Sequence, residues 1–203
     1  MKLGIFIIPK DKFLKTINYH KKKIKSIYGN NKYLSHPPHC TLYVFNIFKK
    51  NIKEIKKIKV IEYKQPIKFK INKLNVFKND VLTGKDTIFF EVDKNRQILN
   101  FQKFIINNFS KNAVIKKNSF KFSDSIMKKN FNKYGYPFIG KNWRPHFTIV
   151  SIKEKKLEDQ YFKNLLKKKF NFYSQISKIY IYEIIKDEHK LISSIKIIPT
   201  KCL

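Results

Sequence analysis

Two short segments of this sequence share one pattern, and this pattern constrains the possible folds more than any other feature. Each segment reads His-x-Thr followed by an apolar run: His39-Cys40-Thr41-Leu42-Tyr43-Val44-Phe45 and His146-Phe147-Thr148-Ile149-Val150. A proline precedes each histidine, at Pro38 and Pro145. β-Branched and aromatic residues dominate both runs, so we predict that each is a β-strand.

Alternation along a strand places the key side chains of each motif together. His39 and Thr41 are predicted to share one face, as are His146 and Thr148, while Cys40 points to the opposite face. If both pairs face one cleft, they supply two imidazoles for proton transfer and two hydroxyl groups that can bond to phosphate oxygens. Such a set is sufficient to open a phosphodiester without a metal ion.

The segments Pro-His-Cys-Thr-Leu and Arg-Pro-His-Phe-Thr-Ile resemble the paired motifs of the two-histidine (2H) phosphoesterase superfamily. That group includes bacterial 2′-5′ RNA ligase-like proteins and cyclic nucleotide phosphodiesterases. The resemblance covers essentially the whole chain and implies that His39, Thr41, His146 and Thr148 are catalytic, with no cofactor. We interpret the chain as a hydrolase of cyclic phosphodiesters, at RNA ends or in small nucleotides. Two alternatives stay open: RNA 2′-5′ ligation by the same residues, and a basic RNA-binding protein of this fold without relevant turnover.

The order of predicted elements occurs twice along the chain. The motif histidines are 107 positions apart, and the similar segments that begin at Ile71 and Ile176 are 105 positions apart. A shared offset indicates an internal repeat. We therefore predict an α+β fold of two pseudo-symmetric lobes around a central cleft, each an antiparallel sheet with helices on its outer face. The chain 1–203 is expected to form one bilobal domain, with lobes near 1–85 and 86–203 that exchange strands.

Periodicity and turn residues give approximate bounds for the other elements. Helices are expected near 12–27, 51–58, 94–109 and 154–168. Strands other than the two motif strands are expected near 3–8, 67–76, 87–92, 173–185 and 190–198. The connection 110–142 has no clear periodicity and is expected to be rich in loops.

Three further residues are candidates for substrate binding. Arg144 precedes His146 by two positions and can fork to a phosphate, or it is a surface residue at the strand start. Tyr43 follows Thr41 by two positions and either stacks on a base or packs in the core. Tyr136 lies in a glycine-flanked aromatic segment that forms either a wall of the cleft or a packed loop.

The charge of the chain favours a polyanionic partner, which here means an RNA or nucleotide substrate. It carries 45 Lys and Arg against 14 Asp and Glu, for a formal net charge of +31. Such an excess attracts nucleic acid at low salt. Arginine occurs only at Arg96 and Arg144, however, and the abundance of Lys, Asn and Ile is equally typical of an AT-rich coding sequence. Selected basicity and an unselected lysine coat both remain open.

The cysteines and remaining histidines suggest no metal site and no disulfide. Cys40 and Cys202 have no metal-ligand spacing and suggest no disulfide framework, so we expect a reducing, cytoplasmic compartment. We also expect the protein to be a monomer. No apolar run approaches the ~20 residues that cross a membrane, so no membrane partner is expected. His20 and His189 have no motif around them and are predicted to be surface residues.

Overall fold

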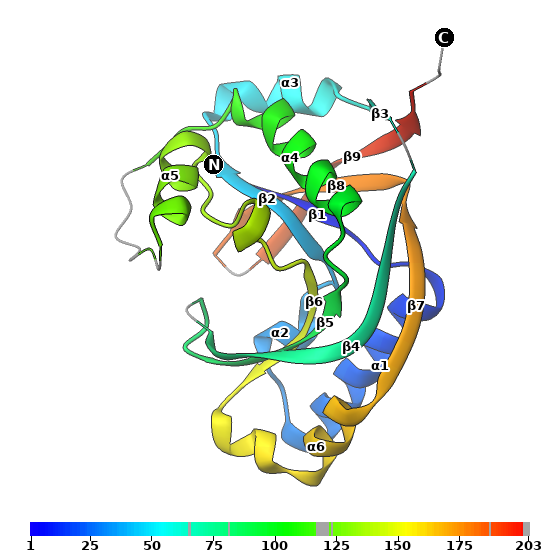
Figure 1. The fold of residues 1–203 in the computed structure, drawn as a ribbon. Coiled ribbons are helices and arrows are strands. Elements are labelled where there is room, and N and C mark those ends of the chain that lie inside the picture. Colours follow the sequence, from blue (N-terminus) through cyan, green and yellow to red (C-terminus); the bar gives the residue numbers. More distant parts are fainter. Residues whose placement is uncertain (65, 81, 117–121, 123, 187, 201–203) are drawn as a thin grey trace.

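Two curled β-sheets form the framework of the molecule (Figure 1), which is a computed structural model that describes residues 1–64, 66–80, 82–116, 122, 124–186 and 188–200. Sheet A has the strand order β2-β1-β8-β9-β3, and sheet B has the order β6-β5-β4-β7. Neighbouring strands are antiparallel except for the parallel pair β3 and β9. The predicted α+β class with two lobes is confirmed.

The strands are β1 (Lys2–Ile7), β2 (Cys40–Asn46), β3 (Val60–Tyr63), β4 (Ile67–Asp80), β5 (Lys85–Val92), β6 (His146–Ile152), β7 (Lys169–Ile176), β8 (Lys178–Ile185) and β9 (Glu188–Pro199). The helices are α1 (Asp11–Tyr28), α2 (Lys32–Ser35), α3 (Ile52–Lys57), α4 (Arg96–Ser110), α5 (Ser125–Tyr134) and α6 (Gln160–Lys167), with short 3₁₀ turns η1 (Lys49–Asn51), η2 (Gly140–Asn142) and η3 (Glu154–Glu158).

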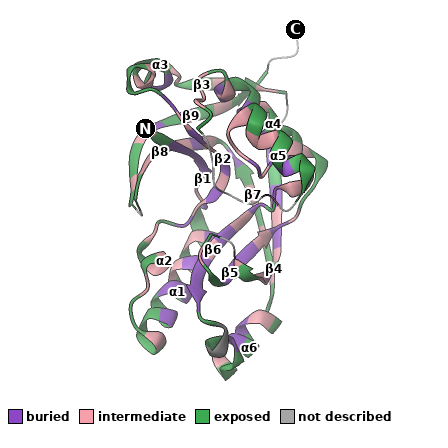
Figure 2. Ribbon diagram, turned by 90° about the vertical axis from the view of Figure 1, so that its left-hand side faces the viewer, coloured by how far each residue is buried: buried purple, intermediate pink, exposed green. Residues whose placement is uncertain are grey.

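The two long helices connect the sheets. Helix α1 follows β1 of sheet A and packs against β6 of sheet B, and α4 follows β5 of sheet B and packs against both β2 of sheet A and β4 of sheet B. On α1, the ring of Phe13 meets Phe90 and Phe147 edge-on at 5.2 and 5.0 Å. Burying one such ring contributes roughly 1.5–3 kcal/mol. Figure 2 shows buried residues along the strands of both sheets.

The two motif strands carry the same irregularity at equivalent positions. Leu42 in β2 and Ile149 in β6 are each an extra residue that the neighbouring strand does not match. These two residues are 107 positions apart, the same offset as that of the motif histidines. A β-bulge bends its strand and redirects side chains. The pseudo-symmetry of the lobes therefore extends to the local backbone of the two motifs.

The structure differs from the sequence-based expectation in the second half of the chain. The strand expected near 173–185 is two strands, β7 and β8, which belong to different sheets. The helix expected near 154–168 is the turn η3 followed by the shorter helix α6. The loop-rich connection 110–142 contains α5, whose N-cap Asp124 accepts a hydrogen bond from the Met127 amide and whose C-cap Gly135 is left-handed. Asp124 and Gly135 are ordinary helix signals, and Met127, Phe131 and Tyr134 between them have helical spacing, so this helix could have been predicted.

Candidate active site

The four motif residues have the same exposure pattern in both lobes. His39, Thr41, His146 and Thr148 are half-buried, while the residues between them, Cys40 and Phe147, are 1% and 0% exposed. Histidine and threonine of each motif therefore share the more open face of their strand, as the alternation predicts.

Both motif histidines are held by the same hydrogen bond. Nδ1 of His39 lies 2.8 Å from the carbonyl oxygen of Pro37, and Nδ1 of His146 lies 2.6 Å from that of Arg144. A carbonyl oxygen only accepts, so Nδ1 carries the proton in each ring. In the neutral form, Nε2 of each imidazole then has a free lone pair, which is the arrangement that a general base needs.

Three contacts bring the two motifs together across the junction of the sheets. Strands β2 and β6 are neighbours at the centre of the molecule (Figure 1), although they belong to different sheets. The backbone of His146 lies close to the side chain of Cys40, where it opposes the rise that burial gives to the pKa of the thiol. The indole Nε1 of Trp143 donates to the carbonyl oxygen of Thr41 at 2.9 Å. Each motif thus anchors the other.

An aromatic ring supports each imidazole from the adjacent strand. The ring of Phe6 in β1 lies 4.3 Å from that of His39, and the ring of Phe89 in β5 lies 5.1 Å from that of His146. Phe6 and Phe89 pair directly with Thr41 and Thr148, so they occupy equivalent positions in the two lobes. These rings limit the rotation of each imidazole and displace water from one side of it.

The two histidines differ in their electrostatic surroundings. Burial lowers the pKa of His39 to about 3; the hydrogen bond to Pro37 opposes this shift, and the neighbouring His189 adds to it. Burial also lowers the pKa of His146, but there Asp80 and Glu91 act to raise it. The charge of Arg144 lowers it further, so the two histidines differ in that His146 has carboxylates beside it while His39 has only cations and other histidines.

Arg144 lies beside His146, on the side that the sequence predicts. Its Nη2 is 3.5 Å from Oε1 of Glu91, and its guanidinium carbon is 4.8 Å from the ring centre of Phe77. The side chain is 52% exposed. Stacking on an aromatic ring and pairing with a carboxylate hold the guanidinium in one place while its remaining donors face solvent.

The two tyrosine candidates lie away from the open face of the motifs. Tyr43 is 0% exposed, and its hydroxyl donates to the carbonyl oxygen of Tyr134 at 2.6 Å. Of the two alternatives that the sequence leaves open for Tyr43, the structure has the packed core position, because the bulge at Leu42 reverses the alternation after Thr41. Tyr136 is half-buried against the Tyr43 ring, and burial, followed by the charge of Cys40, raises its pKa.

Of the two histidines expected at the surface, His189 is half-buried at the edge of the site and His20 is buried. The ring of His189 lies 5.0 Å from that of His39 and 5.3 Å from that of Phe6, so His189 borders the site. The sequence around His189 does not indicate that it lies near His39, because His189 is in β9, far along the chain from either motif. His20 is 5% exposed, and its spacing from Phe13, Ile17 and Ile24 on α1 places it in the buried stripe.

Among the residues that the structure describes, no three His, Cys, Asp or Glu side chains are placed to hold a metal ion. Within that same part of the chain, no helix combines the length and apolar character that a membrane crossing requires.

Comparison with known proteins shows that this structure is similar in fold to solved structures. No protein-family model matches the sequence, and no curated protein matches it. The crystal structure of TT0787 of Thermus thermophilus is similar with a TM-score of 0.58 at 10% identity, over 97% of each chain. The crystal structure of a phosphoesterase is similar with a TM-score of 0.51 at 9% identity, over 96% of this chain and 95% of the other. The two-lobed architecture therefore also occurs in a phosphoesterase.

Proposed function

We propose that this chain is a metal-independent phosphoesterase that hydrolyses a cyclic phosphodiester, such as the 2′,3′-cyclic phosphate of an RNA end or a small nucleotide. The observation that carries the proposal is the duplicated motif: two imidazoles with protonated Nδ1 atoms, each with a threonine on the same open face, on strands in contact. The fold similarity to a phosphoesterase supports it.

In the proposed reaction, the two histidines divide the proton transfers. Nε2 of His39 takes a proton from water as the water oxygen bonds to phosphorus. The bond between phosphorus and one ring oxygen breaks, and Nε2 of His146 donates its proton to that oxygen. The product is a phosphomonoester beside a free hydroxyl. The hydroxyls of Thr41 and Thr148 would donate to the non-bridging oxygens as negative charge grows on them.

The assignment of base and acid follows from the surroundings of the rings. His39 sits among His189, His146 and Lys21, which disfavour a further positive charge, so it is the better neutral base. The carboxylates Asp80 and Glu91 stabilise a proton on His146, which suits the acid. Arg144, held at 3.5 Å from Glu91, would meet a phosphate oxygen on the His146 side.

The test is turnover of an oligonucleotide with a 2′,3′-cyclic phosphate and of small 2′,3′-cyclic nucleotides, each with EDTA present. Product formation that EDTA leaves unchanged is the expected result. Absence of turnover on both substrates, together with salt-sensitive RNA binding, would replace the proposal with an RNA-binding function. Joining of RNA ends by the same protein would show that the reverse reaction dominates.

A further inference from the structure

One row of paired residues runs from His146 to the outer edge of sheet B. His146 in β6 pairs with Glu91 in β5, Glu91 pairs with Lys73 in β4, and Lys73 pairs with Lys169 in β7. Directly paired residues in a sheet share a face. At ~4.8 Å per strand, this row covers about 14 Å from the histidine to Lys169.

The opposite face of this sheet packs against α1, so the row lies on the face turned away from that helix, which we call the open face. Phe90 and Phe147 point to α1, where they meet the ring of Phe13. On the open face, the side chain of Lys73 is 64% exposed and Lys169 is exposed. A shallow cavity of about 450 Å³ lies between β4 and β7 on this side, lined in part by Lys70, Lys73, Lys169 and Tyr173.

Cations outnumber carboxylates along this face, and the carboxylates have partners. Oε2 of Glu91 is 3.4 Å from Nζ of Lys73 and 3.1 Å from the Asn75 amide, and Oε1 is 3.5 Å from Arg144. Asp93, at the border of the cavity, accepts a hydrogen bond of 2.7 Å from Asn72. Glu91 therefore fixes two cations in place, while Lys70 and Lys169 add two more charges farther out.

The aromatic ring of Tyr173 is exposed beside these lysines. Tyr173 is 70% exposed, the most exposed tyrosine among the described residues. It pairs with Lys70, whose Nζ lies 5.2 Å from the ring centre. An exposed ring next to a line of cations is the arrangement that binds unpaired nucleotides, with bases stacked on the ring and phosphates near the lysines.

We propose that this open face of sheet B binds the single-stranded RNA that precedes the reacting phosphate, with Tyr173 stacking on a base and Lys70 and Lys169 contacting phosphates. The link to His146 rests on the proposed function. The substrate class is then an RNA chain of several nucleotides, for which a mononucleotide is a poor substitute. A duplex would not fit the contact with Tyr173, because its bases are already stacked on one another.

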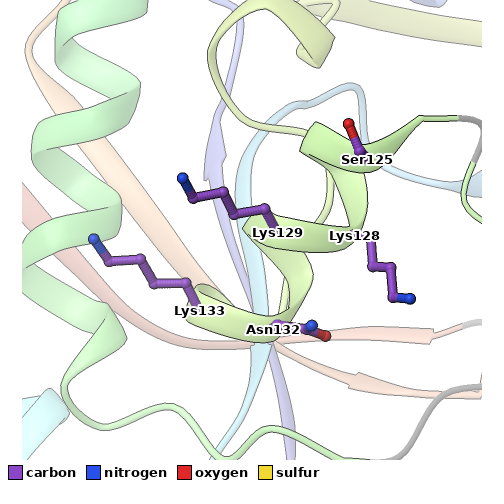
Figure 3. A pocket seen from close by; sticks show the side chains of 5 residues that line it. All are labelled: Ser125, Lys128, Lys129, Asn132 and Lys133. Atoms are coloured by element: carbon purple, nitrogen blue, oxygen red, sulfur yellow. The ribbon is translucent and has the colours of Figure 1, made fainter.

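Another lysine-lined cavity serves as the internal control. It lies on α5 and is bordered by Ser125, Lys128, Lys129, Asn132 and Lys133, with a volume of about 470 Å³. Figure 3 shows its lysines spreading to both sides of the helix. None of the described residues that line it is aromatic, and α5 belongs to neither sheet, so the pairing that links Lys169 to His146 has no counterpart there. If lysine alone determined RNA binding, this cavity and the face of sheet B would contribute equally.

The first experiment measures RNA binding without turnover. Fluorescence anisotropy of a labelled ten-nucleotide single strand is recorded with the His39→Ala/His146→Ala protein. Adding Tyr173→Ala should raise the Kd by about 5- to 150-fold, the range for losing one base stack, and Tyr173→Phe should keep the affinity. Tyr19→Ala, which removes a 61% exposed ring from α1, should have no such effect. Equal losses for Tyr173→Ala and Tyr19→Ala would overturn the proposal.

The second measurement tests the lysines through the salt dependence of the same Kd. Replacing Lys70 and Lys169 by Gln should make the slope of log Kd against log salt shallower by about 1.4, at roughly 0.7 per phosphate contact on a single strand. Replacing Lys128 and Lys129 by Gln should leave the slope unchanged. Equal changes in slope for the two lysine pairs would contradict a specific binding face.

Measurements of turnover distinguish failure of the proposed RNA-binding face from failure of the proposed enzymatic function. With the catalytic histidines intact, Tyr173→Ala should lower kcat/KM for a cyclic-phosphate oligonucleotide relative to that for a cyclic mononucleotide. If the wild-type chain turns over neither substrate while Tyr173→Ala still weakens RNA binding, the enzyme proposal fails and the binding face stands. If turnover is present and Tyr173→Ala changes neither the Kd nor this ratio, the binding face is wrong and the enzyme proposal stands.

Discussion

The indole nitrogen of Trp143 donates a hydrogen bond of 2.9 Å to the carbonyl oxygen of Thr41. This bond joins the segment that precedes the second motif to the backbone of the first. Trp143 is 3% exposed, so the indole is held inside the protein. The relative position of the two motifs therefore depends on a residue that takes no part in the proposed proton transfers.

Replacing Trp143 with Phe should destabilise the fold and slow the reaction. An unpaired buried carbonyl costs about 1–3 kcal/mol, and the smaller ring leaves a cavity that adds to this cost. Urea unfolding monitored by far-UV circular dichroism gives the free energy of unfolding, and kcat reports the alignment of the motifs. Tyr19→Phe, at a 61% exposed position, is the control. An unchanged free energy of unfolding in Trp143→Phe would show that the bond does not anchor the motifs.

Lys21 is predicted to position the loop that leads to His39. Lys21 is 5% exposed, and its ammonium group donates to the carbonyl oxygens of Tyr33 and His36 at 2.7 and 2.6 Å. Burial lowers its pKa to about 8, so it remains charged at pH 7. Lys21→Met should lower kcat about 10-fold or more, because the carbonyl that orients His39 belongs to the next residue, Pro37.

The control for Lys21→Met is Lys22→Met, which removes an exposed lysine one position along α1. A purely structural role would lower the melting temperature of Lys21→Met without changing kcat at a temperature where the protein is folded. A loss of kcat in the folded protein, absent in Lys22→Met, is the result expected for positioning.

The roles of base and acid can be separated with an activated leaving group. A nitrophenyl phosphodiester expels a weakly basic oxygen that needs little protonation, so loss of the general acid matters less for it. His146→Ala should therefore recover much of its activity on this substrate relative to the cyclic nucleotide. His39→Ala should lose at least ~100-fold on both substrates. The opposite pattern, with His39→Ala recovered, would mean that the roles are reversed.

Acid sensitivity of the fold should depend on His20. Burial, followed by the charge of Lys168, lowers its pKa to about 4 from the usual 6.5. Below pH 6.5 the unfolded chain binds a proton that the folded chain resists, so stability is full above pH 6.5 and falls as the pH drops toward 4. In His20→Gln, the difference in unfolding free energy between pH 7 and pH 4.5 should be smaller than in the wild type. An identical difference in both proteins would assign the acid sensitivity to other groups.

Local sequence patterns were sufficient to predict the motif strands and the internal repeat. The alternation around His39 and His146 gave the shared faces, and Ile71 and Ile176, which gave the second offset, lie in the neighbouring strands β4 and β7. The sequence left two positions open for Tyr43 because a β-bulge, which decides between them, leaves no mark on composition. The move from β7 to β8 was missed because only Ser177 separates the two strands, with no glycine or proline between them while the chain changes sheets.

Long-range packing accounts for what the sequence could not indicate. His189 reaches His39 only because β9 pairs with β8, and no local signal encodes that pairing. The row from His146 to Lys169 likewise exists only in the register of four strands, which come from distant parts of the chain. By contrast, the buried position of His20 follows from its helical spacing and could have been predicted.

The central claim is that His39 and His146 act together on one phosphate without a metal ion. The most direct measurement is the rate at which the wild type, His39→Ala, His146→Ala and the double variant open the 2′,3′-cyclic phosphate of an oligonucleotide in the presence of EDTA. We predict that EDTA does not slow the wild type, and that each single replacement lowers the rate by at least ~100-fold. The double replacement should cost far less than the product of the two, because the residues act as a unit. Full turnover by either single variant, or loss of wild-type turnover on chelation, would contradict the claim.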